Sequence, residues 1–225
     1  IYERERGSFR FIPGPVFAQL VLADEINRAT PKTQSALLEA MEERQVTADG
    51  ETRMLPDPFF VIATQNPSHQ IGTFSLPESQ LDRFLMRIEL GYPDREAERA
   101  LLSGGNPRDR LQGLAASLSP TDLAPLQQAT SGVRTAPALI DYVQALVDAT
   151  RREPAWLHGL SPRAALALLA AARAWAFIDG RDLTLPEDVQ AVFAGVAAHR
   201  LRLVQGNGHA SADELDALLR RVPLP

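Results

Sequence analysis

A chain of 225 residues, of which 45% are hydrophobic, is long enough to bury the core of one large domain or of two modest ones, which excludes a wholly disordered protein. It contains no cysteine, so disulfide frameworks, thiolate metal sites and cysteine nucleophiles are excluded. The net charge of −5 gives no overall attraction to nucleic acid. No apolar run approaches the roughly 20 residues that span a bilayer, and the first residues do not resemble a signal peptide, so we expect a soluble cytoplasmic protein.

The predicted elements begin with a short aromatic segment. Phe9 and Phe11 alternate with polar residues, the Pro-Gly-Pro sequence at 13–15 is a turn signal, and two apolar residues follow it. This pattern predicts a small hairpin or strand pair within Gly7–Phe17. The hairpin is either an ordinary surface feature or part of a contact surface, and the residues alone leave both interpretations open.

The next segment, Gln19–Arg28, combines a strand pattern with two carboxylates. Residues 20–22 are an unbroken apolar run, which predicts a strand buried on both faces of a mostly parallel sheet. Ligands of open α/β sheets bind beyond the carboxyl ends of the strands, where Asp24 and Glu25 follow. Asp24 suits a Mg²⁺ ion, and Glu25 suits the group that orients a water attacking a phosphoanhydride. Acidic residues also end ordinary strands, so the pair needs support from the rest of the chain.

A helix is predicted from Pro31 to Glu43. Thr30 can cap it, and proline is tolerated at its first position because the N–H that proline lacks would be unpaired there. Apolar residues then recur at helical spacing, and the polar residues, Gln34 among them, are expected on the surface. The segment therefore reads as an amphipathic helix that follows the carboxylate pair.

A second hairpin is predicted after this helix. Gln45–Ala48 and Glu51–Leu55 flank Asp49-Gly50, a dipeptide that readily takes the positive φ angles of a tight turn. The hairpin is mostly polar, so it is either simply solvated or grips a partner or substrate.

A second apolar strand is predicted at Phe59–Ala63, and it is followed by Thr64-Gln65-Asn66-Pro67. If this strand lies beside the one that ends at Asp24, the Asn66 side chain can hydrogen-bond a phosphate or the attacking water. The alternative is an ordinary turn-forming Asn-Pro sequence.

A short helix within Leu76–Phe84 and a further strand at Met86–Leu90 complete the predicted α/β part. Arg83 lies at the end of the helix. It either pairs with Asp82 or Glu78 at the surface or supplies positive charge to a phosphoryl group on a neighbouring subunit.

From residue 93 onward the patterns are helical only, so we expect an α/β domain at 1–92 and a small helical bundle at 93–225. Arg163 lies in the first turn of an alanine-rich helix, where the helix dipole disfavours a cation. Either a salt bridge or a phosphate on the other domain explains its position. Trp156 and Trp175 are expected in the core or at the domain interface. The other predicted helices are Pro93–Leu102, one opened by the capping-box pattern Ser119–Asp122, Pro137–Arg152, Pro186–His199 and Ser211–Arg221.

One absence in the composition bears on phosphate binding. Lys32 is the only lysine and follows Pro31, whereas the phosphate-cradling loop G-x-x-x-x-G-K-[ST] needs a lysine after glycine. These 225 residues therefore contain no such loop.

Five ordered segments closely resemble those of MoxR-type AAA+ ATPases: LVLADEINRA at 20–29, QSALLEAMEE at 34–43, FVIATQNP at 60–67, LPESQLDRF at 76–84 and SPRA at 161–164. The resemblance covers essentially the whole chain. It implies that Asp24 and Glu25 are the Walker B pair, Asn66 is sensor 1, Arg83 is the arginine finger and Arg163 is the sensor 2 arginine of a helical lid. It also implies that the two hairpins are the helix-2 insert and the pre-sensor-1 hairpin.

The resemblance further implies an α/β partial AAA+ core with an all-α lid, which binds ATP and Mg²⁺ and forms a homo-oligomeric, hexameric ring. Such rings act as chaperones that remodel or activate client proteins, often with a partner that carries a von Willebrand factor A domain. The family's phosphate loop precedes these motifs, so we expect a C-terminal fragment that alone neither binds nor hydrolyses ATP appreciably. The alternatives are a non-catalytic protein-binding module and, ranked last, a DNA motor similar to MCM helicases.

Overall fold

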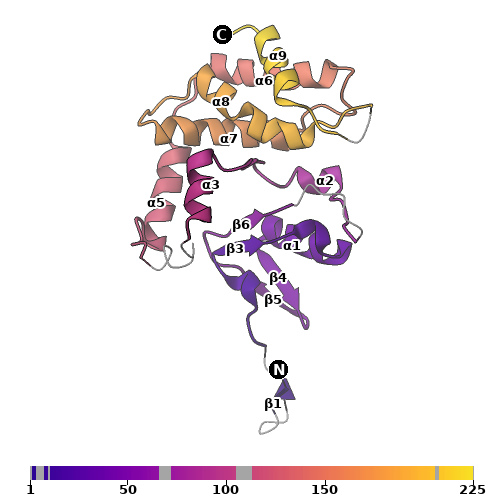
Figure 1. Cartoon of the computed structure of the whole chain (residues 1–225), viewed down its shortest axis with the longest axis vertical. Coiled ribbons are helices and arrows are strands. Elements are labelled where there is room, and N and C mark those ends of the chain that lie inside the picture. Colours follow the sequence, from indigo (N-terminus) through magenta and orange to yellow (C-terminus); the bar gives the residue numbers. More distant parts are fainter. Residues whose placement is uncertain are drawn as a thin grey trace. The chain divides into compact units, whose positions relative to one another are not determined.

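The computed structural model of the chain describes residues 2–3, 8–9, 11–65, 72–104, 113–205 and 208–224. Its contacts divide the chain into two compact units, Ile1–Arg83 and Phe84–Pro225 (Figure 1). The first unit holds the strands and the second is helical, whereas the expected division at residues 92 and 93 stays a prediction. Within the described ranges, no helix has the length and hydrophobicity required to cross a membrane.

Among its described residues, the first unit contains three separate two-stranded sheets, one longer helix and several short helical segments. Strands β1 and β2 are antiparallel, β4 and β5 are antiparallel, and β3 and β6 are parallel. The elements are β1 (Tyr2–Glu3), β2 (Ser8–Phe9), η1 (Pro15–Phe17), β3 (Leu20–Ala23), η2 (Ile26–Arg28), α1 (Pro31–Glu43), β4 (Gln45–Ala48), β5 (Glu51–Met54), β6 (Phe60–Ala63) and α2 (Glu78–Leu81).

The parallel pair β3 and β6 confirms that the two apolar strands are neighbours. Leu20 lies opposite Phe60 and Ala23 opposite Ala63, so both strands end at the same edge. The expectation that β3 is buried on both faces was wrong for the described residues. Val21 and Val61 pack against the core of this unit, but Leu20 and Phe60 on the opposite face are 60% and 57% exposed. The described residues cover this sheet on one side only.

Helix α1 begins and ends where the sequence predicted. The Thr33 N–H donates to the Thr30 side-chain oxygen at 3.3 Å, and Pro31 occupies the first position. The prediction for its buried face was wrong in one respect. Gln34 was expected on the surface, yet it is only 1% exposed and lies on the same face as Leu38.

One of the two predicted hairpins is formed as expected, and the other is formed differently. Strands β4 and β5 confirm the second one, with Asp49 and Gly50 at φ 55° and 78° in the turn. For the first, the strand pair joins β2 to the earlier β1, and residues 15–17 form a 3₁₀ turn instead of a returning strand. Pro15 explains this, because its fixed φ suits the first helical position and its nitrogen cannot donate to a ladder.

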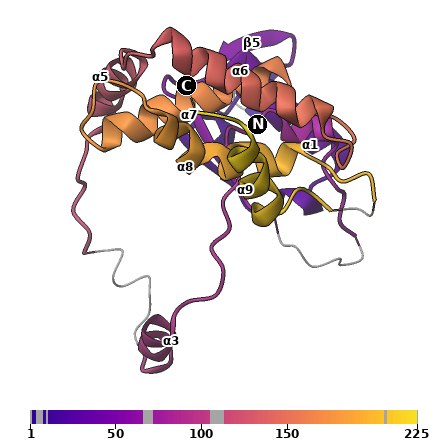
Figure 2. The same cartoon turned by 90° about the horizontal axis from the view of Figure 1, so that it is seen from above.

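The second unit is a helical bundle in which α6, α7, α8 and α9 pack together (Figure 2). Its helices begin within two residues of the predicted starts, with the largest difference at α3, which begins at Arg95 instead of Pro93. The capping boxes predicted at Ser119 and Ser211 are both formed. The described elements are α3 (Arg95–Leu102), α5 (Pro120–Ser131), α6 (Pro137–Arg152), α7 (Pro162–Ile178), α8 (Pro186–Ala197), η3 (Ala198–Arg200) and α9 (Ala212–Arg221).

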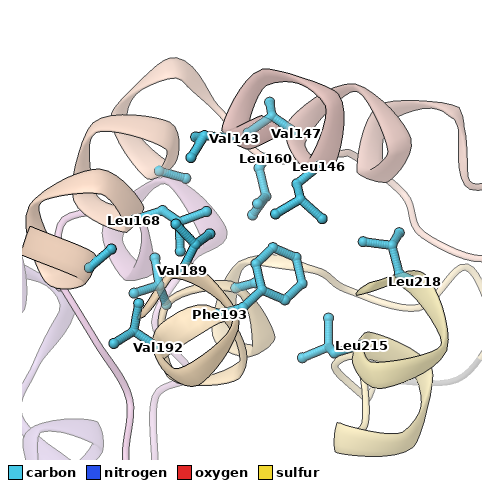
Figure 3. Close-up of a cluster of buried hydrophobic side chains, with 14 of the residues drawn as sticks. Val143, Leu146, Val147, Leu160, Leu168, Val189, Val192, Phe193, Leu215 and Leu218 are labelled. Carbon is cyan, nitrogen blue, oxygen red and sulfur yellow. The ribbon is translucent and has the colours of Figure 1, made fainter. Parts of the chain in front are cut away.

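The core of this bundle surrounds Phe193 of α8, which is fully buried (Figure 3). Leucines from α6, α7 and α9 converge on it, and the alanines of α7 let α7 and α8 approach closely. Trp156 is buried as expected. Trp175 is 50% exposed, so the expectation that it lies in the core was wrong. The alternative, that it lies at an interface, stays a prediction.

The strand predicted at Met86–Leu90 was also wrong, since these residues form no strand. A strand needs a hydrogen-bonded neighbour, and this segment packs on the end of α8 instead. The Arg87 N–H donates to the Gly195 carbonyl at 2.8 Å, and Arg200 donates to the carbonyls of Phe84 and Leu85. The segment is therefore held by the helical bundle.

Candidate functional site

The carboxylate pair lies at the shared carboxyl edge of β3 and β6. Because Ala23 and Ala63 are paired in register, Asp24 and Thr64 follow them side by side. The Thr64 N–H donates to the Ala23 carbonyl at 3.1 Å, and the Thr64 hydroxyl donates to Asp24 Oδ1 at 2.6 Å. The condition on which the predicted site depended, that the two strands are adjacent, is therefore met.

Glu25 has a backbone conformation that residues other than glycine seldom adopt, with φ 49° and ψ 50°. Such a left-handed residue costs roughly 1–2 kcal/mol. Two hydrogen bonds offset this cost, from the Glu25 N–H to Thr64 Oγ1 at 2.8 Å and from the Ile26 N–H to the Thr64 carbonyl at 3.0 Å. The Glu25 carboxylate is 3.0 Å from Arg28 Nη1, and both side chains remain partly exposed.

The Gln34 side chain holds the turn that follows Glu25, a role that was not predicted from the sequence. The Gln34 side-chain amide donates to the carbonyls of Ile26, Ala29 and Phe74 at 3.0, 3.2 and 3.2 Å. It thereby ties η2 and the segment at residue 74 to α1. The spacing in the sequence could have indicated that Gln34 is buried. Gln34 precedes Leu38 by four residues, so both side chains lie on the same face of α1.

Arg83, the predicted arginine finger, follows the short helix α2. Its Nη2 is 2.8 Å from Glu42 Oε2 of α1, a partner that the sequence did not suggest. The two side chains are 32% and 35% exposed. A partly exposed pair of this kind stabilises the protein by at most about 1 kcal/mol, so the guanidinium can leave Glu42 at little cost.

Two other residues were predicted to belong to the site. Asn66 lies outside the described residues. Arg163 lies on the surface of the second unit at the start of α7, where Ser161 caps the helix by accepting from the Ala164 N–H at 3.0 Å. The roles of both residues stay predictions.

The residues at the edge fit a Mg²⁺-nucleotide chemically. Within the described ranges, no cluster of three or more histidine or acidic side chains could hold a metal ion by itself. Mg²⁺ does not need one, because it keeps most of its waters and binds through one or two carboxylates plus phosphate oxygens. Asp24, an exposed carboxylate at a sheet edge, is a donor of the right kind.

Comparison with known proteins identifies this architecture. The family model of the ATPase family associated with various cellular activities (AAA) matches residues 1–86, and the AAA lid domain model matches residues 148–219. The chain is similar over its whole length to the chaperone MoxR1 of Mycobacterium tuberculosis, at 43% identity, and to the protein MoxR of Methylorubrum extorquens, at 34%. It spans 62% and 73% of the lengths of these relatives.

The crystal structure of a candidate ATPase from Cytophaga hutchinsonii is also similar. It superposes with a TM-score of 0.86 at 37% identity, and the alignment covers the whole of this chain and 72% of the other. The chain belongs to the MoxR family of AAA+ ATPases.

Proposed function

We propose that this chain is part of a MoxR-type ATPase that hydrolyses ATP between the subunits of a ring and uses the energy to remodel client proteins. The observation that supports this most is the Asp24–Glu25 pair at the common carboxyl edge of two parallel strands, the place where open α/β sheets bind ligands. The name of the Mycobacterium tuberculosis relative, a chaperone, supports the remodelling part. The hexameric ring, the client and the partner with a von Willebrand factor A domain rest on the family resemblance.

The two carboxylates divide the chemistry between them. The Thr64 hydroxyl engages Oδ1 of Asp24, and the Asp24 carboxylate would hold Mg²⁺, an ion that keeps most of its waters. The ion, when bound, neutralises charge on the β- and γ-phosphate oxygens. Glu25 orients the attacking water and accepts its proton. Its exposed pairing with Arg28 is worth at most about 1 kcal/mol, so Glu25 is readily released for this role.

Three further residues complete the proposed site. Asn66 helps to position the attacking water, and Arg163 contacts the nucleotide from the helical lid. Arg83 leaves Glu42 and stabilises the charge on the transferred phosphoryl of a neighbouring subunit.

The phosphate-binding loop that such an enzyme needs is not among these 225 residues. We therefore expect no ATP turnover from the 225-residue chain alone, because its phosphates would lack a cradle of backbone N–H groups and a lysine. A protein that contains this chain together with such a loop is called the complete ATPase below.

The DNA-motor alternative gains no support from the second hairpin. Its tip is formed by Asp49, Gly50 and Glu51. Arg53, the nearby cation, already pairs with Glu51 and stacks on Phe11 with its guanidinium carbon 3.8 Å from the ring centre. A basic DNA-gripping tip would instead present unpaired cations to the phosphate backbone. A non-catalytic binding module remains the alternative to the ATPase.

Mixed rings of the complete ATPase test the shared site. Glu25→Gln and Arg83→Ala subunits are expected to be inactive separately and to recover activity when mixed, because some interfaces then pair an intact Glu25 with an intact Arg83. Arg134→Ala is the matched control, since Arg134 forms an exposed ion pair with Asp182 in the second unit. It should retain full activity alone. No recovery at any mixing ratio would contradict the proposal.

A further inference from the structure

Every polar atom of Thr64 forms a hydrogen bond with the turn that carries the two carboxylates. Its N–H donates to the Ala23 carbonyl, and its carbonyl accepts from the Ile26 N–H, so both flanks of the Asp24–Glu25 pair are bonded to Thr64. Its hydroxyl accepts from the Glu25 N–H at 2.8 Å and donates to Asp24 Oδ1 at 2.6 Å. One side chain thus contacts both members of the proposed catalytic pair.

This double contact requires a hydroxyl group. A hydroxyl is a donor and an acceptor at once, so the same oxygen can take the Glu25 N–H and give its own proton to the Asp24 carboxylate. Valine, which has nearly the same shape, can do neither. Serine can do both, but lacks the methyl group that holds a threonine side chain in one rotamer on a strand.

The contact fixes both carboxylates. The bond to Oδ1 sets the orientation of the Asp24 carboxylate. The bond from the Glu25 N–H supports the left-handed backbone at φ 49°, and that backbone sets the direction in which the Glu25 side chain leaves the chain. Without the hydroxyl, the backbone of Glu25 would relax and both side chains would change direction.

We propose that Thr64 is a positioning residue for ATP hydrolysis, which holds Asp24 and Glu25 in the geometry required for phosphoanhydride cleavage. This inference rests on the proposed function. The proposed role requires no contact between Thr64 and the nucleotide or the attacking water. Its effect passes through the two carboxylates.

The test compares Thr64→Val and Thr64→Ser in the complete ATPase, with steady-state ATP hydrolysis measured over a range of ATP and Mg²⁺ concentrations. Removing a group that orients metal-binding or catalytic side chains typically costs about 10- to 100-fold. We expect a loss of this size in kcat for Thr64→Val, a smaller change in KM for ATP, and half-saturation at higher Mg²⁺. Thr64→Ser should restore most of kcat, which a purely structural loss of the methyl group would not allow.

A second measurement separates positioning from stability. In the 225-residue chain, amide hydrogen exchange of Glu25 should be about 10-fold faster in Thr64→Val and nearly unchanged in Thr64→Ser. The matched control is Thr130→Val in α5, which removes a hydroxyl that donates to the Leu126 carbonyl at 2.8 Å. That variant should change neither kcat nor the exchange of Glu25.

The outcomes distinguish this inference from the proposed function. If Glu25→Gln abolishes hydrolysis while Thr64→Val retains wild-type kcat, the positioning role is overturned and the proposed function stands. If kcat falls only as far as the folded fraction falls, with Glu25 exchange unchanged, the positioning role is again overturned. If Glu25→Gln itself hydrolyses ATP normally, the catalytic role of the pair and the role of Thr64 are both overturned.

Discussion

His199 makes the helical unit sensitive to pH. The side chain is only 3% exposed, and its Nε2 lies 3.2 Å from the Phe84 carbonyl. Burial, and then the charges of Arg200, Arg87 and His209, lower the pKa of His199 from 6.5 to about 4, against a smaller opposing effect of the Phe84 carbonyl. The folded protein therefore holds this imidazole neutral at pH 7, whereas the unfolded chain binds a proton more readily.

The magnitude follows from proton linkage. The unfolded chain binds the extra proton between pH 6.5 and about 4, so the contribution of His199 to stability is complete above pH 6.5 and is lost as pH falls through that range. At about 1.4 kcal/mol per pKa unit, the full loss is about 3 kcal/mol. Between pH 7.5 and pH 5.0, His199 alone should lower the free energy of unfolding by about 2 kcal/mol.

Urea unfolding of the 225-residue chain at these two pH values measures the effect, with fluorescence of the buried Trp156 reporting on the helical unit. His199→Gln keeps a donor for the Phe84 carbonyl but cannot gain a proton, so it should lose about 2 kcal/mol less than the wild type on acidification. His158→Gln, at an exposed position, is the control and should behave like the wild type. Equal losses for the wild type and His199→Gln would show that His199 does not cause the pH dependence.

Two other buried polar groups give predictions of opposite sign. Gln34→Leu leaves the carbonyls of Ile26, Ala29 and Phe74 without their donor, so thermal or urea unfolding should show a loss of about 2–4 kcal/mol in the first unit. A variant as stable as the wild type would show that the amide does not hold this turn. Thr184 is 2% exposed and its hydroxyl oxygen has no partner among the described residues, so Thr184→Val should gain about 1 kcal/mol. Destabilisation by a similar amount would contradict this.

The features that could be predicted from the sequence are those that depend on neighbouring residues. The bounds of α1 follow from Thr30 and Pro31, and the β4–β5 turn follows from Asp49-Gly50. The capping boxes of the helical unit are equally local. Each of these signals acts over four residues or fewer, so no knowledge of tertiary structure is needed to read it.

The features that were missed depend on residues distant in sequence. Thr64 meets Asp24 and Glu25 across about 40 positions, and Arg83 meets Glu42 across a similar interval. Residue type places a carboxylate at a strand end, but only strand pairing shows which hydroxyl fixes it. The segment 86–90 has the composition of a strand and failed to form one, since strand formation depends on a neighbour that composition does not specify.

The catalytic role of the carboxylate pair is tested most directly by the effect of Glu25→Gln on the complete ATPase, with nucleotide binding and hydrolysis measured separately. The substitution keeps the size of the side chain and removes its ability to accept a proton. ATP is expected to bind with near wild-type affinity while kcat falls by about 100-fold or more, the range typical of a lost general base. Hydrolysis at the wild-type rate by Glu25→Gln would contradict this role.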